Sequence, residues 1–261
     1  MSRRRAPALL AVPAVLGLAL LLLPLVGLLV RAPWRSLPDL LTEQTVRQAL
    51  WLSLRAAASA TVISLVLGVP LAWALARLEL PGRRLLRALV TLPLVLPPVV
   101  GGLALLLVFG RHGLLGPALD RAFGIRLPFT TAAVVLAETF VAMPFLVVTV
   151  EGALAAGDLK LEEAAASLGA GPWTTFRRVT LPQIGPSVGA GAVLCLARAL
   201  GEFGATITFA GSFPGTTQTM PTAVYLALER DPQAAIALAL VLLALSVTVL
   251  VLLRDRWLRP A

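Results

Sequence analysis

Six long apolar runs, separated by segments that hold most of the charges, constrain this chain more than any other feature of its sequence. A helix needs about 20 mostly apolar residues to cross the core of a bilayer. Only 13% of the 261 residues are charged, whereas about a quarter are charged in a typical soluble domain. Lipid is therefore the solvent for most of the chain. The predicted spans are residues 8–30, 50–76, 88–109, 130–150, 184–210 and 234–253.

Helices are the expected form of these spans, because backbone groups in lipid must form their hydrogen bonds within the protein. We therefore predict an all-α integral membrane fold, with residues 1–261 forming a single transmembrane domain. The first apolar run, residues 6–30, holds 25 consecutive uncharged residues. A signal peptide has an apolar core of roughly 7–15 residues, so we expect this run to be retained as the first span.

The distribution of arginine and lysine predicts the orientation of the chain. With a cytoplasmic N-terminus, the inside segments carry 13 of these residues and the outside loops carry 7. Because basic residues concentrate in cytoplasmic loops, we expect both termini in the cytoplasm and a multi-pass location in the plasma (inner) membrane. The net charge of +9 does not indicate nucleic-acid binding, because the arginines lie in short loops without interleaved aromatic residues.

The segment between the fourth and fifth spans, residues 157–182, has the most informative sequence. Its residues Leu161, Ala164, Ala165 and Leu168 recur at the spacing of one helical face. Such a helix has two interpretations from its pattern alone. It either lies on lipid or on its own bundle, or it docks into a groove of a cytoplasmic partner.

Residues near the ends of this helix fit its predicted boundaries. Asp158 is a suitable N-cap, and Glu162 and Glu163 place negative charge in the first turn, near the positive end of the helix dipole. Gly169 can adopt the left-handed conformation that ends a helix, and Pro172 suits the first turn of the next one. We therefore expect a short helix, a glycine hinge and a second short helix.

The same segment resembles the EAA loop of ABC import permeases, whose pattern is EAA-x3-G-x9-I-x-LP. Here Glu163-Ala164-Ala165 is followed at the same spacing by Gly169 and then by the residues 179–182, and only Val179 departs from the pattern. The resemblance implies a MetI-like ABC importer permease fold with six transmembrane helices. It also implies that the loop is the coupling helix, which receives motion from an ATPase subunit. The residues given this role are Glu162, Glu163, Ala164, Ala165, Gly169, Leu181 and Pro182.

Two further stretches resemble molybdate permeases in particular. They are LPLVLPPVVGGLALLLVFG at residues 92–110 and ARALGEFGATITFAGSFPGTTQTMPTAVY at residues 197–225. The resemblance extends over about residues 45–253 and implies import of molybdate, and also of tungstate, which is nearly isosteric with it. Sulfate permeases have a similar Gly-Glu-Phe/Tyr-Gly core, so sulfate or thiosulfate is the alternative substrate.

Partners follow from the same resemblance. The chain has no Gly-x4-Gly-Lys-Ser/Thr sequence for binding nucleotide phosphates, so we expect ATP and Mg²⁺ to be used by a separate ATPase subunit. No cofactor or metal is expected on this chain. One copy has a single coupling loop whereas an ABC motor has two, so we expect a homodimer with two ATPase subunits. An external molybdate-binding protein completes the expected complex.

Candidates for the pathway or its gate lie in the third and fifth spans. Arg198 and Glu202 are four residues apart on one helical face, so they either pair to hold helix packing or serve the passing anion. Pro97 and Pro98 must interrupt or kink the third span, because each lacks a backbone donor. That break is either structural or exposes backbone to a pore.

Hydroxyl groups at the end of the fifth span are also open to two interpretations. Thr206 and Thr208, followed by Ser212, Thr216 and Thr217, can donate to a tetrahedral dianion. Serine and threonine in membrane helices also bond neighbouring backbone, which would make the same hydroxyls structural.

Two other classes of protein fit the sequence poorly. An intramembrane enzyme would need a catalytic set, and the chain offers only Glu138, Glu202 and the distant His112. A passive channel would have no use for a coupling loop.

Overall fold

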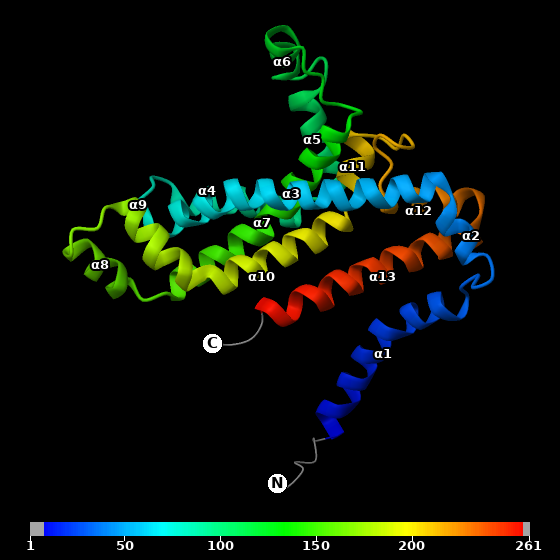
Figure 1. Ribbon diagram of the computed structural model, residues 1–261, viewed down its shortest axis with the longest axis horizontal. Helices are drawn as coiled ribbons and strands as arrows, with labels where there is room; N and C mark the ends of the chain where they lie inside the picture. Colours follow the sequence, from blue (N-terminus) through cyan, green and yellow to red (C-terminus); the bar gives the residue numbers. More distant parts are fainter. Residues whose placement is uncertain (1–7, 258–261) are drawn as a thin grey trace.

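The computed structural model describes residues 8–257, and all regular secondary structure in that range is helical, as predicted. Figure 1 shows a bundle of helices that run along the longest axis of the molecule. By length and composition, five helices can cross a membrane, and a sixth crossing is possible if one bent pair counts as a span. The main helices of the bundle are α3 (Gln44–Arg77), α7 (Thr131–Ala156), α10 (Leu181–Leu200) and α13 (Pro232–Trp257).

The core of the bundle lies where α3, α7 and α10 pack against one another. Small side chains contribute to these contacts, and Ala57, Ala60 and Ala142 are completely buried. In a membrane, small residues permit the close backbone approach that holds helices together. Gly191 shows how close the approach is, because a Cβ atom there would lie 2.8 Å from Cδ1 of Leu146. The core therefore combines close backbone approach at small residues with buried large side chains such as Leu75, Leu146 and Leu154.

The third predicted span, residues 88–109, is not one continuous helix. It is divided into α4 (Arg83–Val95) and α5 (Pro98–Phe109), whose axes differ by 116°. The predicted interruption at Pro97 and Pro98 is confirmed, since Pro97 precedes α5 and Pro98 is its first residue. The chain turns away from the bundle at this point (Figure 1), an angle that the two prolines alone did not predict.

The fifth predicted span, residues 184–210, is also shorter than expected. Helix α10 ends at Leu200, and residues Gly204–Phe209 form a separate short helix, α11. Phe203 has a φ of −126° and ψ of −56°, which is not helical. Apolar composition continues through this break, so hydropathy alone extended the span too far. Helix α11 packs mainly against α5 and also against α7.

The remaining helices surround this bundle. Helix α1 (Ala8–Val30) matches the first predicted span, lies apart from the bundle in Figure 1 and touches α13. At the same end as the start of α3, α2 (Leu37–Thr42) packs on α3, and α12 (Met220–Arg230) packs on α13. Helix α6 (Gly116–Phe123) lies beyond α5.

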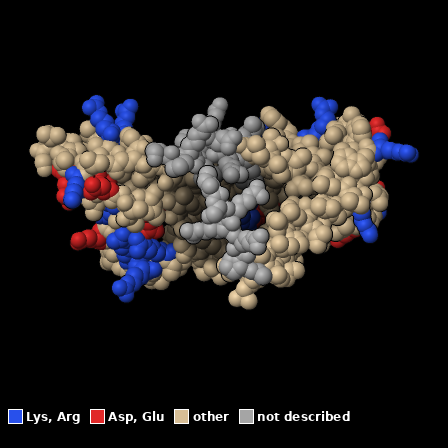
Figure 2. Space-filling view, turned by 90° about the horizontal axis from the view of Figure 1, so that it is seen from below, with Lys and Arg blue, Asp and Glu red and all other residues tan. Residues whose placement is uncertain are grey.

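Among the described residues, charged side chains gather at the two ends of the longest axis, and little charge is visible on the tan surface between them (Figure 2). One end carries α4 and the segment after α7, and the other carries α2 and α12. A bilayer excludes charge from its core, so this pattern aligns the longest axis with the membrane normal.

Candidate coupling surface and translocation site

The predicted coupling loop projects from the end of the molecule beyond α7 (Figure 1). It consists of α8 (Leu159–Ser167), α9 (Pro172–Thr175) and a short π-helical segment, η1 (Phe176–Thr180). The predicted helix boundaries are confirmed. The carboxylate of Asp158 accepts a hydrogen bond from Lys160 N at 3.0 Å, and Gly169 has a left-handed φ of +86°. Pro172 begins α9.

The apolar face of α8 is exposed rather than packed on the bundle. Leu161 is 52% exposed and Leu168 is 89% exposed, and Trp173 on α9 is 70% exposed. Ala164 and Glu163 on the same helix are exposed as well. Large apolar side chains at a charged end of the molecule, away from the apolar middle, are typical of an interaction surface.

Arg77, the last residue of α3, ties α8 to the bundle. Its guanidinium binds the Glu162 carboxylate at two points, Nε to Oε2 at 3.2 Å and Nη2 to Oε1 at 2.9 Å. Nη1 donates to the carbonyl of Leu154 near the end of α7 at 3.0 Å. Both charged side chains are mostly buried, which strengthens the interaction relative to a surface ion pair. One arginine therefore joins α3, α7 and the coupling loop.

Aromatic side chains form a second connection between α3 and the loop. Phe176 on η1 makes an edge-on contact with Trp73 on α3, with ring centroids 6.2 Å apart. Trp173 on α9 stacks on Phe176, with ring centroids 5.8 Å apart. Such aromatic pairs contribute about 0.5–1.5 kcal/mol beyond the area that they bury. The loop is thus held at two separate points on the end of α3.

The predicted coupling residues fall into two groups in the structure. Glu163, Ala164 and Ala165 lie on α8. Of these three, Ala165 is half-buried and the other two are exposed. Leu181 and Pro182 instead form the first turn of α10, directly after η1. The motif therefore extends from the exposed surface to the start of the next long helix.

Arg198 and Glu202 form the predicted ion pair at the end of α10. Arg198 Nη2 lies 2.7 Å from Glu202 Oε2, and the Glu202 side chain is almost completely buried. The other carboxylate oxygen accepts a hydrogen bond from Ala205 N at 2.7 Å. Glu202 therefore satisfies a free amide in the first turn of α11, a role that its sequence position alone did not reveal.

Helices α5 and α11 cross almost backbone to backbone beside this ion pair. A Cβ atom at Gly102 would lie 2.7 Å from the carbonyl oxygen of Ala205, and one at Gly204 would lie 2.8 Å from Cβ of Pro98. Pro98 is thus brought next to the segment that follows Glu202, and Pro97 lies one residue before this contact. The break in the third span and the break in the fifth span meet at one junction.

Threonine side chains at the junction have different surroundings. Thr208 Oγ1 donates to the carbonyl of Gly204 at 2.8 Å, which is the structural use of a helical threonine. Thr206 is completely buried, and its hydroxyl has no hydrogen-bond partner within the described part of the chain. Thr217 accepts a hydrogen bond from Phe213 N at 2.9 Å and so stabilises the loop after α11.

Glu138 on α7 faces the interior of the bundle, a point that the sequence left undecided. Its side chain is 1% exposed, and Oε2 has no hydrogen-bond partner among the described residues. Within residues 8–257, no three histidine, cysteine or acidic side chains lie together in a way that could hold a metal ion.

Long helices that can cross a bilayer, with an exposed loop tethered at one end, fit one class of protein: a membrane subunit of an ABC import system. Residues 64–260 match the family described as the binding-protein-dependent transport system inner membrane component. The match covers well over half of the chain, and this protein belongs to that family.

Among curated relatives, the chain is similar to the molybdenum transport system permease protein ModB of two bacteria. It is 51% identical to that of Mycobacterium tuberculosis over 225 residues, which cover 86% of this chain and 85% of the relative. It is 46% identical to that of Escherichia coli K12 over 182 residues, which cover 70% of this chain and 80% of the relative. The chain is 38% identical to the probable sulfate transport system permease protein cysT of Marchantia polymorpha. The match spans 217 residues, which cover 82% of this chain and 75% of the relative.

Solved structures confirm the MetI-like permease fold. A chain of a bacterial alginate ABC transporter, solved with a pentasaccharide-bound periplasmic protein, superposes with a TM-score of 0.74 at 17% identity, covering 95% of this chain and 92% of that one. A chain of the MetNI methionine ABC transporter in an inward-facing conformation superposes with a TM-score of 0.63 at 19% identity. The superposition covers 81% of this chain and 93% of that one. At these identities, the likeness concerns the fold.

Proposed function

We propose that this chain is the membrane-spanning permease of an ATP-driven importer of molybdate, and that tungstate uses the same pathway. The observation that carries the proposal is the identity of 46–51% to molybdenum permeases over most of the chain, against 38% to a sulfate permease. Sulfate or thiosulfate stays the alternative substrate. The protein is a multi-pass component of the inner membrane.

The partners of the proposed importer are a second copy of this chain, two ATPase subunits and an external molybdate-binding protein. The exposed apolar face of α8, with Leu161 and Leu168, supports a partner at the coupling loop. ATP and Mg²⁺ belong to that ATPase, and this chain has no catalytic role of its own. In this arrangement the coupling loop and both termini are cytoplasmic, and the end with α2 and α12 meets the binding protein.

Motion passes from the ATPase to the pathway through α3 in the proposed mechanism. A displacement of α8 pulls on α3 through the Arg77–Glu162 ion pair and the Trp73–Phe176 contact. Helix α3 packs along α7 and α10, so it cannot move without them. Helix α10 leads directly to the junction of α5 and α11, where both broken spans meet. That junction is the proposed gate region, and Pro97, Pro98, Thr206 and Thr208 are its candidates.

Substrate-stimulated ATP hydrolysis tests the proposed substrate. The assembled complex in lipid vesicles would receive the external binding protein either empty or loaded with molybdate, tungstate or sulfate. We expect hydrolysis to rise with molybdate and tungstate and to stay at the level of the empty protein with sulfate. If hydrolysis rose only with sulfate, the substrate of the importer would be sulfate and not molybdate. No rise with any of the three oxyanions would contradict the importer proposal.

A further inference from the structure

An apolar groove lies at the coupling-loop end of the molecule, between α3 and the segment formed by α9 and η1. It has a volume of about 260 Å³ and is lined by Pro70, Trp73, Pro172, Trp173 and Phe176. None of these side chains is charged, and Trp173 is largely exposed. The groove therefore presents aromatic surface to an apolar occupant from outside the described chain.

The groove lies at the boundary between the apolar thickness of the molecule and its charged end. Trp73 and Pro70 lie four and seven residues before Arg77, the last residue of α3, which is about 6 and 10 Å at 1.5 Å per residue. Both fall within the second predicted span, residues 50–76. Tryptophan is enriched at this level of a bilayer, where its ring lies among the headgroups. Lipid therefore reaches the part of the groove that α3 forms.

Two arginines directly follow the last aromatic residue of the groove. Trp173, Phe176 and Arg177 have the spacing of one helical face, and Arg178 is the next residue. Both arginine side chains are exposed, and no carboxylate of the described chain lies within 4.0 Å of their nitrogens. They do not line the groove itself, so they are available to a charged group at its edge. Figure 2 shows other Lys and Arg side chains gathered at this end.

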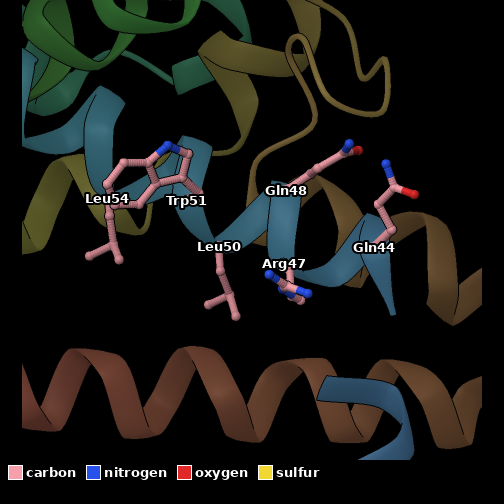
Figure 3. A pocket seen from close by; sticks show the side chains of 6 residues that line it. All are labelled: Gln44, Arg47, Gln48, Leu50, Trp51 and Leu54. Carbon is pink, nitrogen blue, oxygen red and sulfur yellow. The ribbon is translucent and has the colours of Figure 1, made fainter. Parts of the chain in front are cut away.

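A hollow at the opposite end of α3 provides a comparison. It has a volume of about 650 Å³, and Gln44, Arg47 and Gln48 line it together with Trp51 and two leucines (Figure 3). Its tryptophan therefore shares the hollow with amide and guanidinium groups, which an acyl chain cannot satisfy. Of the two, the groove at the coupling-loop end has the lining suited to an acyl chain.

We propose that this groove binds one anionic phospholipid from the leaflet at the coupling-loop end, with an acyl chain against the aromatic rings and the headgroup on Arg177 and Arg178. A guanidinium donates parallel hydrogen bonds to phosphate oxygens, and basic residues beside a membrane attract anionic lipids. The inference rests on the proposed function for one point, that this leaflet is the cytoplasmic one. Leu161 and Leu168, which form the proposed ATPase contact on α8, do not line the groove, so lipid and ATPase can bind together.

Native mass spectrometry of the assembled complex of this chain with its ATPase tests the proposal by counting bound lipids. The complex would be purified in detergent, freed of lipid and titrated with phosphatidylglycerol, or with phosphatidylcholine, which can have the same acyl chains but has no net charge. We expect one tightly bound phosphatidylglycerol per copy of this chain and weaker binding of phosphatidylcholine. Arg177→Gln/Arg178→Gln should lower the affinity for phosphatidylglycerol about thirtyfold and leave that for phosphatidylcholine unchanged. Trp173→Ala should lower both affinities.

Three variants control for charge and for general loss of surface. Arg177→Lys/Arg178→Lys keeps both charges and should keep the preference for phosphatidylglycerol. Arg84→Gln removes an exposed arginine of α4 at the same end, and Trp51→Ala removes the tryptophan of the opposite hollow. Neither should change the affinity for phosphatidylglycerol.

Several results would overturn the lipid site. They are unchanged phosphatidylglycerol binding after loss of both arginines, equal affinity of the wild type for the two lipids, or equal losses in the Arg84 and Trp51 variants. Binding to the chain alone that the ATPase abolishes would assign the groove to the ATPase instead. Neither ATP nor an oxyanion enters this measurement, so a failure of lipid binding leaves the proposed function in place. Failed oxyanion import by a complex that holds the lipid would contradict the proposed function alone.

Discussion

Arg77 is the residue on which the connection between the coupling loop and the bundle most depends. It makes two hydrogen bonds to Glu162 on α8 and one to the carbonyl of Leu154 on α7. The sequence predicted a role for Glu162 from the EAA pattern but gave no partner, because Arg77 lies 85 residues away. A contact of this separation leaves no local periodicity, and only the packing of α3 against α7 brings the two residues together.

Replacing Arg77 with glutamine should weaken coupling while leaving the helices intact. The charged hydrogen bonds to Glu162 contribute about 1.5–3 kcal/mol, so we expect the stimulation of ATP hydrolysis by loaded binding protein to fall about tenfold. Arg84→Gln is the matched control, because Arg84 is exposed at the same end of the molecule. Normal stimulation in an assembled Arg77→Gln complex would mean that the loop transmits motion by another route.

The Arg198–Glu202 pair should hold the junction of α10 and α11 rather than bind the passing anion. Removing one partner of a buried ion pair leaves an uncompensated charge and costs about 3–5 kcal/mol. We therefore expect Glu202→Gln to lower the thermal unfolding temperature of the solubilised protein. The double variant Arg198→Gln/Glu202→Gln should recover most of that loss and still import the oxyanion. A stable double variant without uptake would instead give Arg198 a direct role in transport.

Among the elements, the coupling loop was the most predictable from sequence and the broken spans the least. Cap residues and glycine act locally, so Asp158, Gly169 and Pro172 marked the boundaries of α8 and α9 correctly. Proline predicted the interruption before α5, but it did not predict the angle of 116° or the packing of α5 against α11. The end of α10 at Leu200 was missed because the residues beyond it are also apolar, although Gly201 and Gly204 were available as signals.

The function of Gly169, the glycine hinge after α8, should depend on its left-handed backbone conformation and not on the small size of its side chain. Gly169 has a φ of +86°, and a Cβ atom there would meet no atom within 4 Å. Gly169→Val forces a β-branched residue into a left-handed conformation, at a cost of about 1–2 kcal/mol. We expect normal assembly of the complex and a several-fold loss of substrate-stimulated ATP hydrolysis.

Gly171 provides the matched control for the hinge. It is two residues away, is also free of neighbours within 4 Å, and has a φ of −69° that any residue can adopt. Gly171→Val should therefore leave stimulated hydrolysis near the wild-type rate. Equal effects of valine at the two positions would show that the loop tolerates no added bulk, and would contradict a specific requirement for the left-handed conformation.

At the scale of the whole molecule, sequence predicted the class of fold well because a bilayer permits few solutions. Apolar runs of sufficient length must form helices, and the EAA pattern then selected a MetI-like permease, which the solved structures confirm. What sequence could not provide was which parts of separate spans meet. The junction of α5, α10 and α11 and the two connections from α3 to the loop both depend on contacts between distant segments.

The whole-molecule account has a direct consequence for transport. If α3 carries motion from the coupling loop to the junction, substrate should cross only when the ATPase hydrolyses ATP. The assembly of this chain with its ATPase and binding protein is then both necessary and sufficient for accumulation of the oxyanion. A permease that opened without the loop would behave as a channel.

Uptake of labelled molybdate into vesicles that contain the complete complex tests this most directly. Binding protein is supplied outside the vesicles. Either ATP or a non-hydrolysable analogue is enclosed inside them, where the ATPase subunits lie. We predict accumulation with ATP alone, blocked by tungstate and unaffected by excess sulfate. Equal molybdate flux with the analogue, or without nucleotide, would contradict ATP-driven import through this chain.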